Sequence, residues 1–302
     1  MASDNRILIG TASWTDATLL KSGKFYPREV KTAEARLRYY SAEFPIVEVD
    51  STYYAMPSVT NAALWAERTP DDFVFNIKVF RLFTQHQTDP KVLPPNVRVM
   101  LGESQSRQLY YNDLGAELQD ELWRQFHLSL EPLRSAGKLG ALLFQFPKWF
   151  LPNRGSRVYM EQIRQRLPDH TIALEFRHES WFEGRQRDSI LAFERELGFC
   201  NVIVDEPQLP GSIPTVWEAT LPGLAMVRMH GRNADTWNLK GLKAASDRFN
   251  YDYRDEELRD FITPVRHLGE QAENVHMIFN NNMEDQGIRN ARTMLRLLSD
   301  SP

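Results

Sequence analysis

The stretch Thr171-Ile172-Ala173-Leu174-Glu175-Phe176-Arg177 is an apolar, partly β-branched run that ends in charged side chains. Seven further runs of this kind recur along the chain, at residues 7–11, 46–50, 73–78, 141–145, 202–205, 226–230 and 275–280. Strands of a parallel sheet that is wrapped in helices are buried on both faces, and they appear in a sequence as continuous apolar runs. Eight such strands close a (β/α)8 barrel, so the sequence predicts this α/β fold.

The segments between the runs indicate helices, and the strand–helix alternation continues to the end of the chain. The predicted helices cover residues 32–43, 61–67, 117–136, 158–167, 187–198, 255–268 and 287–298. Barrels of this class commonly reach about 250 residues as one domain. We therefore expect residues 1–302 to form a single TIM-barrel domain with a core of about residues 7–298. Long βα-loops at 85–115, 207–223 and 231–253 follow strand ends, and we expect them to rim one mouth at the C-terminal face.

Composition and charge narrow the class of protein. An apolar share of 42% and a charged share of 25% are ordinary for a soluble globular protein. The formal net charge of −4 gives no global attraction to nucleic acid or to an anionic membrane. The chain has no apolar stretch of membrane-spanning length and no apolar signal-peptide core at its start, so we expect a cytoplasmic protein without a membrane partner. The single cysteine, Cys200, cannot form an internal disulfide, and we expect it to pack.

Polar side chains gather at the ends of the predicted strands, where the loops of such a barrel build its site. Side chains alternate along a strand, so residues of one parity face the barrel axis, and the polar set of each run is assigned to this interior. The polar side chains predicted to face inward are Glu48, Asp50, Asn76, Lys78, Gln145, Glu175, Arg177, Asp205, Arg228, His230, Arg232, Asn280 and Asn282. Four carboxylates thus face four permanent cations, with one histidine and several amides between them.

Three interpretations of this constellation remain open. It could be an ion-pair network that fills the barrel top, because buried charges need partners. It could be a divalent-metal centre with Glu175, Asp205 and His230 as ligands, although the interleaved cations oppose a metal. We favour an anion-binding pocket, because arginine forks and a lysine suit phosphate. The candidate catalytic residues for proton transfer are Glu48, Glu175, Asp205 and His230. The candidate substrate-binding residues are Asp50, Tyr54, Lys78, Gln145, Arg177, Trp181, Arg228, Arg232 and Asn280.

Aromatic residues follow the same strand ends. They are Trp14, Tyr53, Tyr54, Trp181, Trp237, Phe249, Tyr251 and Tyr253. Any one of them could pack a long loop against its neighbours. Together, beside arginines, they favour a ring-bearing anionic ligand such as a nucleotide or a sugar phosphate.

These motifs carry a resemblance to a known family. They are Gly10-Thr11-Ala12-Ser13-Trp14, Phe25-Tyr26-Pro27, Glu48-Val49-Asp50-Ser51-Thr52-Tyr53-Tyr54, Phe75-Asn76-Ile77-Lys78, His86, Gly140-Ala141-Leu142-Leu143-Phe144-Gln145-Phe146-Pro147, Glu175-Phe176-Arg177-His178-Glu179-Ser180-Trp181, Arg228-Met229-His230-Gly231-Arg232 and Asn280-Asn281-Asn282. In this order the chain resembles the Domain of Unknown Function 72 family, also termed YecE-like. The resemblance implies a TIM barrel related to sugar-isomerase and endonuclease-IV-like barrels, and it supplies no reaction. The chain departs from the family at Asp50 and Tyr53, where Asn and Phe are common, and in a long segment at 87–115.

The leading hypothesis is an enzyme that acts on a phosphorylated, ring-bearing compound, with hydrolysis of a phosphoester or glycosidic bond favoured. The second is a nucleic-acid processing or binding protein, by analogy with the endonuclease-IV-like barrels. The third is a metal-dependent sugar isomerase or epimerase. A non-catalytic interaction module would instead expose a broad apolar patch outside the mouth. We predict no cofactor under the leading hypothesis and a divalent metal under the third.

Overall fold

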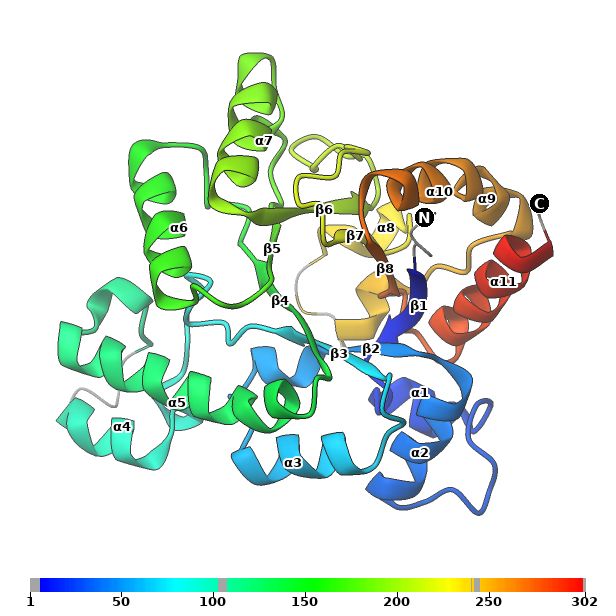
Figure 1. Ribbon diagram of the computed structural model, residues 1–302, viewed down its shortest axis with the longest axis horizontal. Helices are drawn as coiled ribbons and strands as arrows, with labels where there is room; N and C mark the ends of the chain where they lie inside the picture. Colours follow the sequence, from blue (N-terminus) through cyan, green and yellow to red (C-terminus); the bar gives the residue numbers. More distant parts are fainter. Residues whose placement is uncertain (1–5, 103–107, 240, 242–244, 301–302) are drawn as a thin grey trace.

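Eight parallel strands close into a barrel in the order of the chain, which confirms the predicted (β/α)8 fold. The computed structural model describes residues 6–102, 108–239, 241 and 245–300. The strands are β1 (Arg6–Ala12), β2 (Ile46–Val49), β3 (Val74–Lys78), β4 (Leu139–Gln145), β5 (Ile172–Glu175), β6 (Phe199–Asp205), β7 (Ala225–Met229) and β8 (Asn274–Phe279). β1 pairs with β8 and closes the ring (Figure 1).

The register of the strands determines which side chains meet inside the barrel. Residues that lie opposite each other on neighbouring parallel strands point to the same side of the sheet. Glu48 lies opposite Asn76, and Gln145 lies opposite Glu175. At Gly10 a Cβ atom would lie 2.0 Å from the carbonyl oxygen of Ile46, so only glycine allows β1 and β2 to approach this closely. The polar rows therefore converge at the C-terminal ends of the strands.

Helices surround the barrel on its outside (Figure 1). The α-helices are α1 (Ala17–Ser22), α2 (Ala33–Glu43), α3 (Val59–Glu67), α4 (Pro95–Leu101), α5 (Ala116–Ser135), α6 (Arg154–Arg166), α7 (Arg185–Leu197), α8 (Ala234–Trp237), α9 (Asp255–Asp260), α10 (Ile262–Gln271) and α11 (Gln286–Asp300). Short 3-10 turns are η1 (Asp50–Tyr53), η2 (Pro90–Val92), η4 (Tyr111–Asp113), η5 (Glu179–Trp181) and η6 (Ala245–Phe249). All seven predicted helices are present, and the one predicted at 255–268 is divided at Phe261 into α9 and α10.

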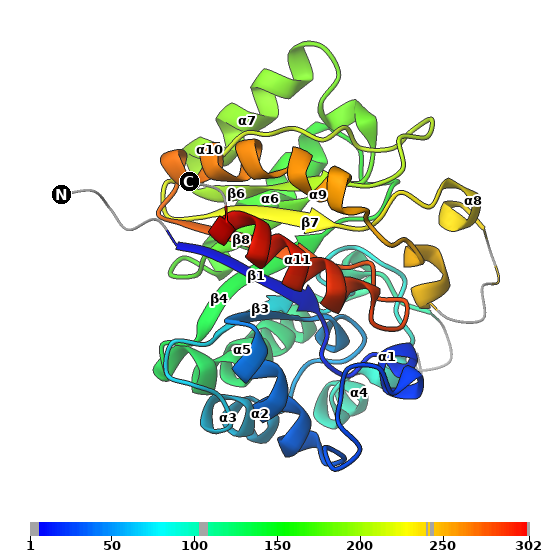
Figure 2. The same ribbon diagram turned by 90° about the vertical axis from the view of Figure 1, so that its right-hand side faces the viewer.

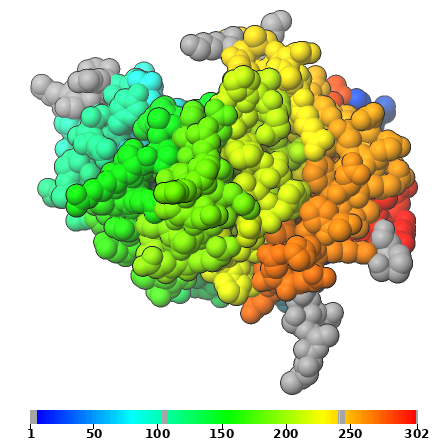
Figure 3. Space-filling view, turned by 90° about the horizontal axis from the view of Figure 1, so that it is seen from above, coloured from blue at the N-terminus to red at the C-terminus, as the bar shows by residue number. Residues whose placement is uncertain are grey.

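No helix connects β6 to β7, although both ends of this connection and everything between them belong to the described part of the chain. An irregular segment, residues 206–224, runs there instead. Figure 3 shows it in yellow-green on the outer surface, between the green α6 and α7 and the orange α9 and α10. It covers the barrel wall in place of a helix.

The three long connections behave differently from one another, and the expectation that all of them rim the mouth is wrong for 207–223. In 85–115 the described residues form η2, α4 and η4, with a bridge between Thr88 and Leu109, and α4 packs against α5 outside the barrel. The connection 207–223 contributes no residue to the cavity at the mouth. The described residues of 231–253 cover the mouth, where α8 lies beyond the arrowheads of the strands (Figure 2). The connection 85–115 also reaches the cavity, through His86.

The core fills the barrel and the layer between strands and helices. Cys200 lies inside it with 1% exposure, and burial raises the pKa of its thiol, so the packing role is confirmed. Among the residues that the structure describes, no helix combines the length and the apolar character that a membrane crossing requires.

Candidate functional site

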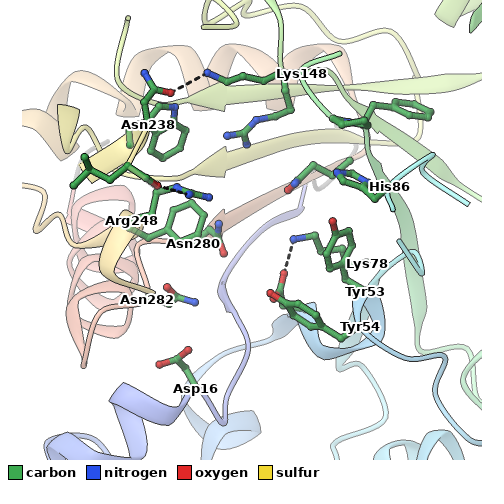
Figure 4. Close-up of a pocket in the computed structure, with 18 residues that line it drawn as sticks. Asp16, Tyr53, Tyr54, Lys78, His86, Lys148, Asn238, Arg248, Asn280 and Asn282 are labelled. Atoms are coloured by element: carbon green, nitrogen blue, oxygen red, sulfur yellow. Dashed lines mark hydrogen bonds and ion pairs between the residues drawn. The ribbon is translucent and has the colours of Figure 1, made fainter. Parts of the chain in front are cut away.

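A cavity of about 590 Å³ opens at the C-terminal ends of the strands (Figure 4). Its lining residues are Asp16, Asp50, Tyr53, Tyr54, Lys78, His86, Gln145, Phe146, Pro147, Lys148, Arg177, Trp237, Asn238, Leu239, Arg248, Phe249, Asn280 and Asn282. Four permanent cations (Lys78, Lys148, Arg177 and Arg248) stand on this wall against two carboxylates (Asp16 and Asp50). The wall therefore carries an excess of positive charge, and five aromatic rings lie among these charges.

Arg228 forms the centre of a buried ion network that does not line the cavity. Its Nε and Nη2 atoms donate to the two carboxylate oxygens of Glu48 at 2.9 and 2.5 Å. Nη1 donates to Glu175 Oε2 and, at 3.1 Å, to Gln145 Oε1. The side chains of Arg228, Glu48 and Glu175 are all 0% exposed. Burial raises the pKa of Glu48, whereas Arg228 overcomes the same effect at Glu175 and holds the pKa of that carboxyl well below its usual value.

His230 belongs to the same buried network. Its Nε2 atom lies 3.2 Å from Glu175 Oε1 and 3.1 Å from Arg177 Nη1, and Asn280 contacts its Nδ1 at 2.8 Å. Burial, together with the neighbouring guanidinium groups, lowers the pKa of His230 to about 3, although Glu175 opposes this shift. The imidazole is therefore neutral near pH 7, and it lies beneath the cavity floor with 1% exposure.

Arg177 connects the buried network to the cavity. Its Nη1 donates to Glu175 Oε1 at 2.7 Å, and its Nη2 lies 2.9 Å from Glu206 Oε2. Its guanidinium group also lies over the ring of Trp237, 5.2 Å from the centroid. Burial raises the pKa of Glu206, and Arg177 offsets only part of that effect. Two carboxylates thus fix the orientation of a cation that faces the cavity.

Lys78 and Asp50 form another ion pair on the cavity wall, with Nζ 2.6 Å from Oδ1 (Figure 4). Burial opposes ionisation of Asp50, but Lys78 prevails and lowers the pKa of this carboxyl below its usual value. The ammonium group lies 4.8 Å from the centroid of the Tyr53 ring. Near neutral pH, Asp50 is therefore a carboxylate, and it reaches the cavity beside a cation.

His86 also faces the cavity (Figure 4). Its Nδ1 lies 2.9 Å from the hydroxyl oxygen of Thr84, and its ring packs edge-on against Tyr53 with centroids 5.3 Å apart. Burial lowers its pKa to about 3, and the nearby Arg81 and Lys78 add to this shift. His86 is thus a neutral imidazole on a cationic wall.

The parity prediction is wrong for Asp205 and Arg232. Asp205 lies opposite Met229, which points away from the axis, whereas Val204 lies opposite the inward Arg228. The Asp205 carboxylate binds Arg232 at 2.7 and 3.0 Å and accepts a hydrogen bond from the Tyr253 hydroxyl at 2.5 Å. We call this group, Asp205, Arg232 and Tyr253, the outer cluster. It lies outside the cavity lining.

Trp181 is not a cavity residue either, so its prediction as a substrate-binding residue is wrong. Its side chain is 0% exposed, its Nε1 donates to the Phe150 carbonyl at 2.7 Å, and its ring stacks on Phe176 with centroids 4.1 Å apart. Trp14 is likewise buried and packs edge-on against Trp65. These rings hold loops to the barrel, which leaves Tyr53, Tyr54, Trp237 and Phe249 as the predicted aromatic residues that line the cavity.

The predicted metal set does not assemble. Glu175 and His230 are neighbours, but Asp205 lies in the outer cluster on the other side of the strand ends. Glu175 already binds two guanidinium groups, so its oxygen atoms are occupied by cations. In the described ranges, no group of three or more His, Cys, Asp or Glu side chains is arranged to hold a metal ion. These residues do not fit a divalent metal.

The predicted residues therefore fall into three places. On the cavity wall are Asp50, Tyr54, Lys78, Gln145, Arg177 and Asn280. In the buried network beneath it are Glu48, Glu175, Arg228 and His230, and outside both are Asp205, Arg232 and Trp181.

The prediction missed Asp16, His86, Lys148, Glu206 and Arg248. For Glu206 a signal existed, because it is the inward-facing position that directly follows Asp205.

Comparisons with known proteins agree with this architecture. The family described as "Protein of unknown function DUF72" matches residues 8–302. The UPF0759 protein YunF of Bacillus subtilis (strain 168) is 31% identical over 295 residues, covering 97% of this chain and 94% of that protein.

Two solved structures of family members share the fold. A DUF72 family protein from Enterococcus faecalis V583 has a TM-score of 0.79 at 30% identity, covering 98% of this chain and 96% of that one. A DUF72 family protein from Thermotoga maritima MSB8 has a TM-score of 0.75 at 29% identity, covering 98% of this chain and 100% of that one. With its barrel, its cavity and these matches over nearly the full length, the chain belongs to the DUF72 family.

Proposed function

We propose that this protein is an enzyme that binds a phosphorylated, ring-bearing small molecule in the cavity at the barrel mouth, with hydrolysis as the favoured chemistry. The observation that carries the proposal is the excess of cations on the cavity wall, four against two carboxylates. A cavity of about 590 Å³ has the size of a small-molecule site. An anion binds most tightly where the cations are already held in position before it binds, because no reorganisation of the site is then needed.

Lys78 and Arg177 are the cations best suited to hold the phosphate. Asp50 fixes the ammonium group of Lys78, and Glu175 and Glu206 fix the guanidinium group of Arg177. Both side chains are mostly buried, at 9% and 11% exposure, so a bound anion is poorly screened by water. The buried network therefore contributes to binding by orienting a cation above it rather than by touching the ligand.

The aromatic part of the wall supports a ring in the ligand. Tyr53 and Tyr54 pack edge-on with centroids 5.1 Å apart, and Trp237 and Phe249 pack edge-on at 5.7 Å. Tyr54 is 49% exposed, which leaves its face open to a ligand. Sugar rings and nucleobases both pack on such faces, so a sugar phosphate and a nucleotide are the two classes we propose.

Hydrolysis requires a group that orients water inside the cavity. The four catalytic candidates predicted from the sequence do not line it, so direct contact with a ligand falls to other residues. Asp50 is a carboxylate on the wall, and its lowered pKa keeps it an acceptor of hydrogen bonds near neutral pH. A water molecule held by Asp50 would lie next to the cations that bind the phosphate.

The test is a thermal-shift screen with nucleotides, sugar phosphates and short oligonucleotides, because a ligand that binds the folded state raises its stability. We expect stabilisation by a phosphorylated ring compound. The double variant Lys148→Ala/Arg248→Ala removes the other two cations of the wall and leaves Lys78 and Arg177 in place. It should weaken binding about tenfold or more, since either cation can add a charge-assisted hydrogen bond to the phosphate, worth about 1.5–3 kcal/mol.

The matched control is Arg187→Ala/Arg195→Ala. It removes two cations that both pair with Glu218 and that do not line the cavity. Equal loss of binding in both double variants would overturn the proposal, because the effect would then follow net charge. Stabilisation by oligonucleotides alone, with an affinity that falls steeply with salt, would instead favour a nucleic-acid protein.

A further inference from the structure

The tautomer of His86 follows from the hydroxyl group beside it. Thr84 Oγ1 lies 3.0 Å from the carbonyl oxygen of Arg81 and 2.9 Å from His86 Nδ1. A carbonyl has no hydrogen to donate, so the hydroxyl group is the donor in its hydrogen bond to Arg81. The Thr84 hydroxyl therefore donates to Arg81, and it can only accept from His86. Nδ1 carries the proton, which leaves the lone pair on Nε2.

The Nε2 atom is free to meet a ligand. No described residue forms a hydrogen bond to it, although Nδ1 is bonded, and the ring lines the cavity (Figure 4). Thr84 is 0% exposed, so the bond that sets the ring orientation is protected from water. One side of the imidazole is thus held by the protein, and the other presents an acceptor to the cavity.

Burial, and after it the charges around His86, lowers the pKa of the ring and keeps this acceptor unprotonated near neutral pH. Lys78 ends β3, Arg81 lies three residues beyond it, and Arg177 follows β5. All three cations lower the pKa of His86. The nearby carboxylate, Asp50, is already paired with Lys78. A dianion bound to these cations would cancel their part of the pKa shift, and the ring would gain affinity for a proton.

We propose that His86 is a catalytic residue whose Nε2 takes a proton from a hydroxyl group of the bound ligand or from a water molecule held beside it. This inference rests on the proposed function, since the phosphate is what makes the ring a competent base. In the step, the O–H bond breaks and the Nε2–H bond forms. The negative charge remains on the oxygen, beside the cations of the wall. A phosphorylated ligand with a free hydroxyl, or one cleaved by water, is the substrate class that fits.

Proton uptake on anion binding tests this role. Sulfate is a suitable probe, because it is a tetrahedral dianion that carries no proton near neutral pH. We would measure the heat of sulfate binding between pH 5 and 7 in buffers with different ionisation enthalpies. Wild-type protein should take up protons on binding, and more of them as the pH falls. His86→Gln should bind sulfate without uptake, because glutamine can accept a hydrogen bond but not a proton.

Three further variants separate this role from a merely structural one. The matched control is His267→Gln, which removes an exposed histidine on α10 and should leave the uptake at the wild-type value. Thr84→Ser keeps the hydroxyl group and should take up as many protons on sulfate binding as wild type. Thr84→Val lacks that group and should take up a different number. Uptake that survives in His86→Gln, or wild-type binding without uptake, overturns the role of His86. If neither sulfate nor any phosphorylated compound binds wild-type protein, the proposed function itself fails.

Discussion

The arginines of two ionic clusters, Arg228 and Arg232, lie four residues apart on the chain, yet they point to opposite sides of the barrel wall. Arg228 points inward to Glu48 and Glu175, and all three side chains are 0% exposed. Arg232 points outward to Asp205 in the outer cluster, where its side chain is 40% exposed. Gly231, at φ +83°, turns the chain between them. The same residue types thus form a sealed network, whose charges water cannot reach if a partner is lost, and an exposed cluster, whose arginine water can reach.

The largest effect should come from breaking the sealed network. Arg228→Met leaves Glu48 and Glu175 without their shared partner in an interior that water does not reach. Removing one member of a buried ion pair costs about 3–5 kcal/mol. We expect a loss of this size in the free energy of unfolding, measured by urea denaturation. A loss of less than about 1 kcal/mol would show that water enters the network.

Glu194 sharpens the comparison, because it is a buried carboxyl without a partner. It lies on α7 at 0% exposure, and neither of its oxygen atoms has a hydrogen-bond partner among the residues that the structure describes. Burial raises its pKa well above 4.5. Above the unfolded pKa, the folded protein therefore holds a proton that the unfolded chain releases, so stability falls as the pH rises. Glu194→Gln should remove this dependence of the unfolding free energy on pH.

Relative to wild type, the free energy of unfolding of Glu194→Gln should rise by about 1–2 kcal/mol between pH 5 and pH 8. This is the order of the cost of one buried unsatisfied polar group. Urea denaturation at both pH values measures it. Glu196→Gln is the control, since Glu196 is an exposed residue of the same helix. If the two variants show the same dependence on pH, Glu194 is not the group responsible.

The outer cluster should tolerate a similar loss of charge better. Asp205→Asn removes the ion pair to Arg232, but the half-exposed guanidinium group can turn to water. We expect a loss of about 1 kcal/mol in unfolding free energy, the usual range for one hydrogen bond. Ligand affinity should stay unchanged, because Asp205 does not line the cavity. A marked loss of affinity would place the outer cluster in the site after all.

The smallest effect on stability should come from the cavity wall. Within the described part of the chain, Lys148 forms one long hydrogen bond, 3.4 Å to Asn238, and its side chain is exposed. Lys148→Met should therefore change the unfolding free energy by less than about 0.5 kcal/mol. Thermal denaturation without ligand measures this value. A larger change would indicate that the wall, like the sealed network, is held by its ion pairs.

The sequence predicts the barrel well because burial on both faces produces apolar runs, and a run is a local pattern. The interior side of β5 and β7 was also predictable, since Glu175, Arg177 and Arg228 share one parity with their polar neighbours. The same test failed on β6, where Asp205 ends the run outward and Glu206, the inward residue, comes after it. The assignment was wrong by one residue, because a shift of one position along a strand moves a side chain to the other side of the sheet.

Depth along the barrel axis could not be predicted. Glu48 and Lys78 both point inward, yet one is sealed beneath the cavity and the other lines it. The difference arises from the stagger of tilted strands, which a sequence does not record. His86, Lys148 and Arg248 were missed for a related reason, since they lie in loops whose course is determined by packing against distant segments.

The closure of the barrel between β1 and β8 has a consequence for how the chain folds as it is made. Six residue pairs, from Arg6 with Asn274 to Thr11 with Phe279, join strands at the two ends of the sequence (Figure 2). Until residues 274–279 have emerged from the ribosome, β1 and β7 each expose an unpaired edge, and such edges template aggregation. Chains that stop before β8 should therefore depend on chaperones more than any point variant considered above.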